Sequence, residues 1–209
     1  MIRILIADDH TVVRKGLKQI LMEEFKSVHI EEVGDAETLV KKVIGGTWDV
    51  IITDLSMPGR SGLDALQQIK QHYPKLPVLI LSVHPEEQYA LRVLKAGAAG
   101  YLNKDMASEE LVNAVHRVLS GRKYISPSVA EKLAVSLDKD GDKLPHEYLS
   151  DREFDVLKLI ASGNSVGQIA EILSLSSTTV STYRARIMAK MNLKNNTSLT
   201  LYAIENKII

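Results

Sequence analysis

The alternation of apolar and amphipathic segments over the first 120 residues constrains the fold of this chain most. Five apolar runs are typical of buried strands and occupy residues 2–7, 28–33, 49–54, 77–82 and 98–102. Five stretches with apolar residues at helical spacing occupy about residues 11–25, 35–45, 62–72, 86–96 and 107–119. Strands that alternate with helices predict an α/β doubly wound fold, a five-stranded parallel sheet in the flavodoxin-like order.

Charged side chains follow three of these apolar runs. Asp8 and Asp9 follow the first run, Asp54 closes the third, and Lys104 follows the fifth. Because parallel strands bring their carboxyl ends to one edge of the sheet, we expect these four side chains to meet in one pocket. Carboxylates at close range repel one another unless a cation lies among them. The pattern therefore predicts a metal site and suggests phosphate chemistry.

Magnesium prefers oxygen ligands in octahedral geometry, and the pocket offers several. Asp9 and Asp54 are the expected ligands, with Asp8 acting directly or through water. The chain turns after the third strand, so a backbone carbonyl near Ser56 is a further expected ligand. We expect the ion to be Mg²⁺ or Mn²⁺.

Asp54 is the candidate nucleophile of this pocket, because carboxylates form acyl phosphates in several phosphotransfer systems. Lys104 would balance the charge of a phosphoryl group, and the hydroxyl of Ser82 could donate to one of its oxygens. A single Asp after a strand is usually only a helix cap or a turn residue. Five such residues on four strand ends are hard to produce by chance. His10 is more typical of a packing or capping residue, and we leave it out of the site.

Composition narrows the class of protein. The 209 residues include no cysteine, which excludes disulfides and thiolate zinc sites. No apolar run approaches the roughly 20 residues that span a bilayer, and the first residues enter a strand directly without a signal-peptide layout. We expect a cytoplasmic protein with no membrane partner. The formal net charge of zero argues weakly against nucleic-acid binding, but residues 151–209 carry a small positive excess.

The pattern changes after Gly121. An amphipathic helix is expected over residues 126–137, followed by a short polar stretch at 138–145. Its aspartates resemble a calcium loop, but Gly141 comes too early for one and no closing Glu follows. We interpret residues 121–147 as a linker that contains one helix.

Residues 148–209 predict a small all-α domain of four helices. Ser150 and Glu153 form a capping box, and the helix that they open ends at Gly163. The remaining helices are expected at about residues 166–173, 177–191 and 197–206, with a turn at Ser174–Ser176. The second and third of the four helices have the layout of a helix-turn-helix unit.

The third of these helices is the expected DNA-reading element, because an α-helix fits the major groove of double-stranded DNA. Its hydroxyl and basic side chains suit contacts with bases and phosphates. The candidate DNA contacts are Thr178, Thr179, Ser181, Thr182, Arg184, Arg186 and Lys190.

Residues 1–120 resemble the receiver domain of two-component response regulators. The matching residues are Asp8-Asp9, Asp54, Met57-Pro58-Gly59, Gly62, Ser82, Tyr101 and Lys104. The resemblance implies that Asp54 accepts phosphate from the histidine of a sensor histidine kinase. It also implies that Asp9, Asp54 and the Ser56 carbonyl hold magnesium, and that Ser82 and Tyr101 form a switch. Asp105 and Ser82 depart from the commonest residues of the family without removing this chemistry.

Residues 149–193 resemble the LuxR-type DNA-binding domain of the NarL/FixJ subfamily. The resemblance rests on Leu149–Glu153, Ile169-Ala170, Ser176, Thr179-Val180 and Lys190–Leu193. Many members carry Val-Lys-x-His in the recognition helix, whereas this chain has Val180-Ser181-Thr182-Tyr183, a string similar to that of BvgA-like regulators. The resemblance therefore leaves the operator sequence open.

Together the resemblances imply a transcription regulator that is controlled by phosphorylation and binds promoter DNA as a homodimer. Two alternatives stay open. A phosphorylated adaptor would use the helical domain to bind protein, and an electrophoretic shift with promoter DNA separates it from a regulator. A magnesium-dependent phosphohydrolase needs a general acid two residues after its nucleophile, where this chain has Ser56.

Overall fold

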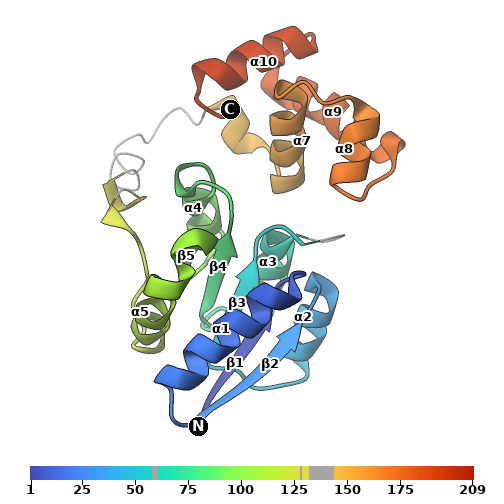
Figure 1. The fold of residues 1–209 in the computed structure, drawn as a ribbon. Coiled ribbons are helices and arrows are strands. Elements are labelled where there is room, and N and C mark those ends of the chain that lie inside the picture. Colours follow the sequence, from blue (N-terminus) through green and yellow to red (C-terminus); the bar gives the residue numbers. More distant parts are fainter. Residues whose placement is uncertain (58–60, 128, 132–143) are drawn as a thin grey trace. The chain divides into compact units, whose positions relative to one another are not determined.

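A computed structural model describes residues 1–57, 61–127, 129–131 and 144–209. The chain forms two compact units, residues 1–138 and 139–209 (Figure 1). Pro58 and Gly59 of the sequence motif lie outside the described residues. So do most of the predicted helix at 126–137 and most of the polar stretch that follows it.

The first unit contains a five-stranded sheet in the order β2-β1-β3-β4-β5, in which every neighbouring pair is parallel. The strands are β1 (Ile2–Ala7), β2 (Val28–Val33), β3 (Val50–Asp54), β4 (Val78–Ser82) and β5 (Gly100–Asn103). Strands β3 and β4 are buried along their whole length, as expected for central strands covered on both faces. The predicted fold class and strand order are confirmed.

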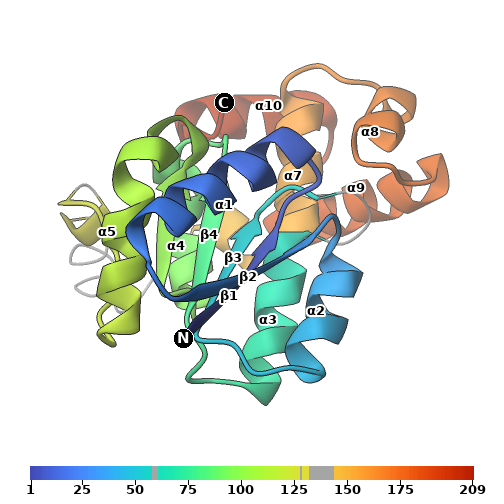
Figure 2. The same cartoon turned by 60° about the horizontal axis from the view of Figure 1, so that its bottom comes forward.

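Helices cover both faces of this sheet (Figures 1 and 2). They are α1 (Thr11–Glu24), α2 (Ala36–Ile44), α3 (Gly62–His72), α4 (Glu86–Lys95) and α5 (Ala107–Leu119), with a short 3₁₀ turn, η1 (Lys104–Met106), before α5. Helices α1 and α5 pack side by side on one face, where their apolar side chains form one core with alternate strand residues such as Ile4, Ile52 and Leu81. Helices α2 and α3 lie together on the opposite face.

The strand register brings the charged residues to one edge of the sheet. Ala7 pairs with Thr53, so that Asp8 and Asp54 are the next residues on adjacent strands. Ser82 pairs with Asn103 at the same edge, directly before Lys104. These residues therefore lie at the carboxyl edge of the sheet, as the sequence predicted.

Gly62 allows the start of α3 to pass directly against the end of β3. A Cβ atom on this residue would lie 1.8 Å from the backbone oxygen of Asp54, and its amide donates to the Leu55 carbonyl at 2.9 Å. Ser61 and Asp64 form a capping box that begins the helix at this point. The glycine is thus required by close backbone approach next to Asp54.

The chain after α5 returns to the first unit. The amide of Tyr124 donates to the Ala99 carbonyl at 2.8 Å, and Tyr124 forms an isolated parallel bridge with Gly100. Val129 is buried. The beginning of the predicted linker is therefore packed on the sheet-containing unit.

The second unit consists of η2 (Pro145–Tyr148), α7 (Asp151–Ala161), α8 (Val166–Ile172), α9 (Ser177–Met191) and α10 (Asn196–Glu205). The predicted capping box of Ser150 and Glu153 begins α7. A second capping box, of Ser165 and Gln168, begins α8. Helix α9 ends at Asn192 in the left-handed conformation, with φ of 53°. The observed limits of α8, α9 and α10 lie within one residue of the predicted limits.

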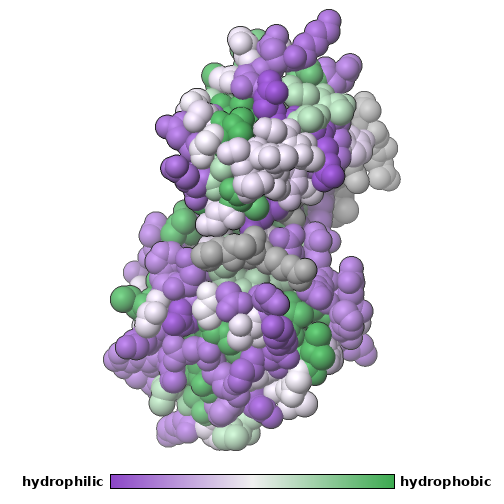
Figure 3. All heavy atoms as spheres, turned by 90° about the vertical axis from the view of Figure 1, so that its right-hand side faces the viewer, coloured by the Kyte–Doolittle hydropathy of each residue, from purple (hydrophilic) through white to green (hydrophobic). Residues whose placement is uncertain are grey.

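The outer surfaces of the two units are of mixed polarity. In the face drawn in Figure 3, hydrophilic residues dominate the sheet-containing unit and apolar residues occur between them in separate spots. Among the helices that the structure describes, none combines the length and the apolar character needed to cross a membrane.

Candidate functional site

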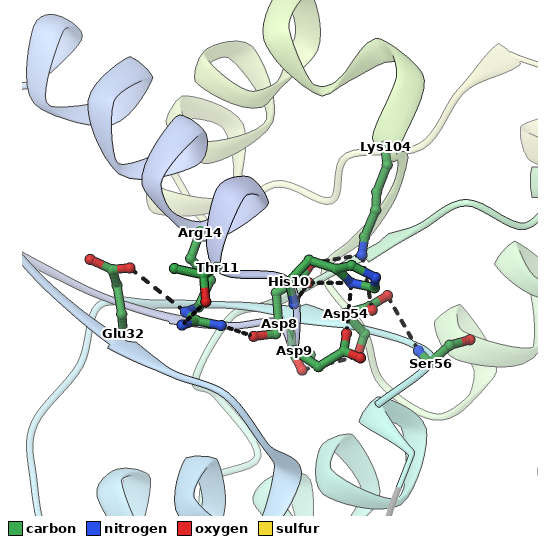
Figure 4. Close-up of polar contacts among 10 residues, drawn as sticks. Asp8, Asp9, His10, Thr11, Arg14, Glu32, Asp54, Ser56 and Lys104 are labelled. Carbon is green, nitrogen blue, oxygen red and sulfur yellow. Dashed lines mark hydrogen bonds and ion pairs between the residues drawn. The ribbon is translucent and has the colours of Figure 1, made fainter. Parts of the chain in front are cut away.

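Asp8 and Asp54 are buried at the carboxyl edge of the sheet, and the partly buried Lys104 contacts both (Figure 4). The ammonium of Lys104 lies 2.7 Å from Oδ2 of Asp8 and 2.9 Å from Oδ2 of Asp54. Asp9, on the same turn as Asp8, is partly exposed. The amide of Ser56 donates to Oδ1 of Asp54 at 3.3 Å. The structure thus brings Asp8, Asp9, Asp54, Lys104 and the backbone of Ser56 together at this edge, where Ser82 also ends β4.

For both Asp54 and Lys104, burial shifts the pKa in one direction and the ion pair between them shifts it in the other. Burial raises the pKa of Asp54 above its ordinary value, because Lys104 offsets only part of the desolvation and Asp8 adds like-charge repulsion. For Lys104, burial disfavours the charged form, but its bonds to Asp8 and Asp54 outweigh this and raise its pKa. Lys104 therefore stays protonated and neutralises part of the carboxylate charge.

The acidic cluster fits a divalent metal ion. One ligand atom from each of Asp8, Asp9, His10 and Asp54 lies within 4.8 Å of all the others. Oδ2 of Asp8 lies 2.7 Å from Lys104 and Oδ1 of Asp9 lies 2.8 Å from Nδ1 of His10, and both buried oxygens make no further hydrogen bond among the described residues. Carboxylate oxygens of this kind are the ligands that magnesium and manganese prefer.

Two residues of this edge make contacts that the sequence did not indicate. Arg14 of α1 donates to the carbonyl of Asp8 at 2.6 Å, and its Nε lies 3.7 Å from Oε2 of Glu32 on β2 (Figure 4). His10 was expected to pack or to cap. It is the N-cap residue of α1, although its side chain is 65% exposed and makes no capping hydrogen bond to the helix. Its backbone amide donates to Oδ1 of Asp8 at 2.8 Å. No periodicity or spacing in the sequence indicates either contact.

Ser82 and Tyr101 form a second group, joined through His84. The hydroxyl of Tyr101 donates to the backbone carbonyl of His84 at 2.7 Å, and the amide of His84 donates to Oγ of Ser82 at 3.1 Å. Nε2 of His84 lies 3.0 Å from Oγ of Ser56, beside Asp54 in the chain. His84, which the sequence did not single out, thus connects the two predicted switch residues with the loop after β3.

The candidate DNA contacts on α9 differ in how freely they face solvent. Thr178, Ser181, Thr182 and Arg186 are exposed and recur at helical spacing along one side of α9. They form the exposed α9 face. Thr179 and Arg184 are half-buried.

Several α9 side chains are engaged within the helical unit. Nζ of Lys190 lies 2.6 Å from Oε2 of the buried Glu153. Nε of Arg184 donates to Oδ1 of Asn196 at 2.8 Å, and Thr179 contacts the capping hydroxyl of Ser176 at 2.8 Å. Lys190 and Arg184 therefore also tie α9 to its neighbours, a task that their sequence positions did not indicate.

Two family matches cover most of the chain. Residues 4–116 match the family described as response regulator receiver domain, and residues 147–203 match the family described as bacterial regulatory proteins, luxR family. The chain is 38% identical to the response regulator UvrY of Escherichia coli (strain K12), across 99% of this chain and 95% of that protein.

Solved structures of RcsB have the same fold. RcsB from Salmonella enterica serovar Typhimurium, bound to promoter rprA in the presence of the phosphomimetic BeF3-, is 29% identical with a TM-score of 0.63, over 97% of this chain and 98% of that chain. A structure of two RcsB dimers bound to two parallel DNAs is 30% identical with a TM-score of 0.58, over 96% of this chain and 97% of that one.

These matches describe a family of regulators and not of classical enzymes. The first match covers nearly all of the sheet that carries Asp54, and the second covers α7, α8, α9 and most of α10. The chain therefore belongs to the response regulators of the NarL/FixJ family, in which a receiver domain is joined to a LuxR-type regulatory domain.

Proposed function

We propose that Asp54 is the phosphoacceptor of this response regulator and that a sensor histidine kinase supplies the phosphate. The observation that carries the proposal is the buried Asp54 carboxylate, with Lys104 at 2.9 Å and two further aspartates beside it. One oxygen of Asp54 attacks phosphorus of the kinase's phosphohistidine, the P–N bond breaks and the imidazole leaves, and Lys104 faces the charge that develops on the phosphoryl oxygens. The site also promotes hydrolysis of its own phosphate.

The metal of the proposed site is Mg²⁺ or Mn²⁺. Asp9, Asp54 and the carbonyl of Ser56 would hold it, with Asp8 directly or through water, because the cluster offers hard oxygen ligands around one point. When bound, the ion supplies positive charge that neutralises the attacking carboxylate and the incoming phosphoryl group.

Ser82 and Tyr101 are proposed to report the state of Asp54. Both bond to the backbone of His84, so a move of Ser82 toward a phosphoryl oxygen would loosen the contact that orients Tyr101. A phosphoryl group adds charge and strong acceptors at this edge, which biases such a two-state element.

The output of the proposed regulator is binding of double-stranded promoter DNA by α9. Its exposed α9 face presents hydroxyl groups and Arg186, which suit base edges and phosphates. The full set of proposed contacts remains Thr178, Thr179, Ser181, Thr182, Arg184, Arg186 and Lys190. Such units bind paired half-sites as dimers, and we propose a homodimer when the protein is phosphorylated or bound to DNA.

The proposed domains are a receiver at residues 1–120, a linker at 121–147 and a DNA-binding domain at 148–209. A protein that binds promoter DNA works in the cytoplasm, and this is the proposed location. The residues Val180–Tyr183 resemble those of BvgA-like regulators, so binding experiments must identify the operator sequence.

The test measures binding of a promoter fragment by fluorescence anisotropy, with and without acetyl phosphate and Mg²⁺. Acetyl phosphate should tighten binding by the wild type and have no effect on Asp54→Ala. Arg186→Ala should weaken DNA binding. It should also reduce the slope of log K against log salt concentration by about one, the share of one phosphate contact. Lys75→Ala, which removes an exposed charge from the receiver, is the matched control. If DNA is not bound in any state, the helical unit is an adaptor for protein instead.

A further inference from the structure

The segment that follows α5 is fastened to the sheet-containing unit along its first residues. The phenol of the buried Tyr124 forms a hydrogen bond with Glu110 of α5, and burial together with this bond raises the pKa of Tyr124 to about 12. A Cβ atom on Gly100 would lie 2.7 Å from the backbone oxygen of Tyr124, so only a glycine in β5 lets the segment pass this close. The start of the linker is therefore a packed part of this unit.

Ser126 holds this segment at a second carboxylate. Its hydroxyl donates to Oε1 of Glu86, the first residue of α4, and accepts a hydrogen bond from the amide of Val129 at 3.3 Å. The amide of Ala130 donates to the Ser126 carbonyl at 3.0 Å, so Ser126 is the N-cap of the helix that begins in the linker. Because the hydroxyl hydrogen points to Glu86, the oxygen lone pairs face the Val129 amide, and the cap depends on α4.

Glu86 is also connected to the acidic edge of the sheet. It lies two residues after His84, whose amide donates to Oγ of Ser82 at 3.1 Å. Pro85 between them has a fixed φ, and the ring of His84 stacks on Tyr89 in the first turn of α4 at a centroid distance of 4.8 Å. A shift of Ser82 toward a phosphoryl group would withdraw the acceptor of the His84 amide and so displace the start of α4.

We propose that Glu86 holds the start of the linker helix through Ser126 while Asp54 is unphosphorylated, and that phosphorylation of Asp54 breaks this contact. The linker is the covalent connection between the two units, so release of its first helical turn frees the chain that leads to α9. The inference rests on the proposed phosphoacceptor role of Asp54 and adds the contact through which that site controls the rest of the chain.

Amide hydrogen exchange, measured by NMR on the full chain, tests the contact. The amides of Val129 and Ala130 should exchange roughly fivefold faster after addition of the phosphomimetic beryllofluoride with Mg²⁺, because loss of a helix cap is worth about that factor. Glu86→Ala should show the faster exchange without beryllofluoride and change little when it is added. Glu86→Gln keeps an acceptor oxygen and should behave like the wild type. So should Glu109→Ala, which removes an exposed charge from α5.

Two results of the exchange measurement would overturn the proposal. One is unchanged exchange of Val129 and Ala130 in wild-type protein whose Asp54 signals show that beryllofluoride is bound. The other is wild-type exchange, with the full response to beryllofluoride, in Glu86→Ala. Circular dichroism checks that each variant is folded.

Binding of a promoter fragment measures the effect of the contact on the output. Without acetyl phosphate, Glu86→Ala should bind the fragment more tightly than the wild type, and acetyl phosphate should tighten its binding by less. Ser126→Ala, which removes the same contact from the linker side, should share both changes. Equal DNA affinity of the wild type and both variants, with and without acetyl phosphate, would contradict the proposal.

These measurements separate the inference from the proposed function. Phosphate uptake at Asp54 is judged by mass spectrometry and does not require Glu86 or Ser126. Uptake with unchanged exchange of Val129 and Ala130 contradicts only the inference. Absence of uptake contradicts the phosphoacceptor role of Asp54, and with it the inference.

Discussion

Arg14 holds the turn that carries Asp8 and Asp9, although it lies on α1 outside the acidic cluster. Its guanidinium donates to the Asp8 carbonyl and to Oγ1 of Thr11, and it faces Glu32. Loss of this support should lower metal affinity, because residues that orient metal ligands typically contribute about tenfold or more. We predict that Arg14→Ala weakens Mg²⁺ binding by roughly this factor and slows phosphate uptake from acetyl phosphate.

The control for this prediction is the exposed neighbour Lys15. Lys15→Ala removes the same charge from α1 and should leave both measurements unchanged. Arg14→Lys keeps the charge but not the planar fork, so it should recover only part of the affinity. Equal Mg²⁺ affinity in Arg14→Ala and the wild type would show that Arg14 is not needed to position Asp8 and Asp9.

The close approach of Gly62 to Asp54 leads to a prediction about the stability of the fold. A methyl group at this position would overlap the Asp54 carbonyl at 1.8 Å, so the backbone of β3 or α3 must shift. We predict that Gly62→Ala lowers the free energy of unfolding by at least about 2 kcal/mol, as overpacking does, and slows phosphate uptake. Urea denaturation of the full chain measures the first effect.

Gly16 supplies the matched control, since a Cβ there meets nothing within 4 Å. It lies inside α1, where Gly→Ala is expected to stabilise by up to about 1 kcal/mol. Opposite signs for the two substitutions would support the close approach at Gly62. Equal stabilisation by both would refute it.

At the level of the elements, α7 and α9 are joined by the ion pair of Glu153 and Lys190. Burial alone would raise the pKa of Glu153, but the bonds from Lys190 and Ser150 outweigh it and hold the pKa below its ordinary value of 4.5. The carboxylate form therefore stabilises the folded helical unit above about pH 4.5, and this contribution is lost as the pH falls through the lower folded pKa.

We predict that Glu153→Gln flattens the loss of stability of the helical unit as the pH falls below about 4.5. Lys190→Met leaves the buried carboxylate without its cation and should cost about 1–3 kcal/mol near neutral pH. The measurement is urea denaturation followed by the NMR signals of Ile187, which is buried on α9. The same acid slope in Glu153→Gln and the wild type would contradict the assignment.

Periodicity and residue type made most of the elements predictable. The predicted limits of α3, α5 and α9 match the structure, because each helix carries a clear apolar stripe or cap signal. The fifth strand was predicted at 98–102 but spans Gly100–Asn103. The amide of Ala98 bonds to the carbonyl of Val93 in α4, and only from Ala99, which bonds to Val78, does the chain contact β4; an apolar run does not show where the turn ends and the strand begins.

The candidate site was predictable where strand ends determine it, and not where side chains meet across elements. Parallel strands align Asp8, Asp54 and Lys104 whatever their rotamers, so sequence position was sufficient. The contact between Lys190 and Glu153 joins residues 37 positions apart. Such contacts depend on how helices pack and on side-chain rotamers, which no local pattern in the sequence records.

On the scale of the whole molecule, the acidic cluster and the exposed α9 face belong to different units of the chain. The proposed regulation therefore requires that charge added at one unit changes how the other binds DNA, a shift between two states of the protein. Each step of the proposed regulation depends on a phosphoryl group on Asp54.

Mass spectrometry of the intact protein after incubation with acetyl phosphate and Mg²⁺ tests that claim most directly. We predict that the wild type gains one phosphoryl group and that Asp54→Ala, shown by circular dichroism to be folded, gains none. Digestion of the wild type should place the group on the peptide that contains Asp54. Phosphate uptake by Asp54→Ala to the level of the wild type would contradict the account.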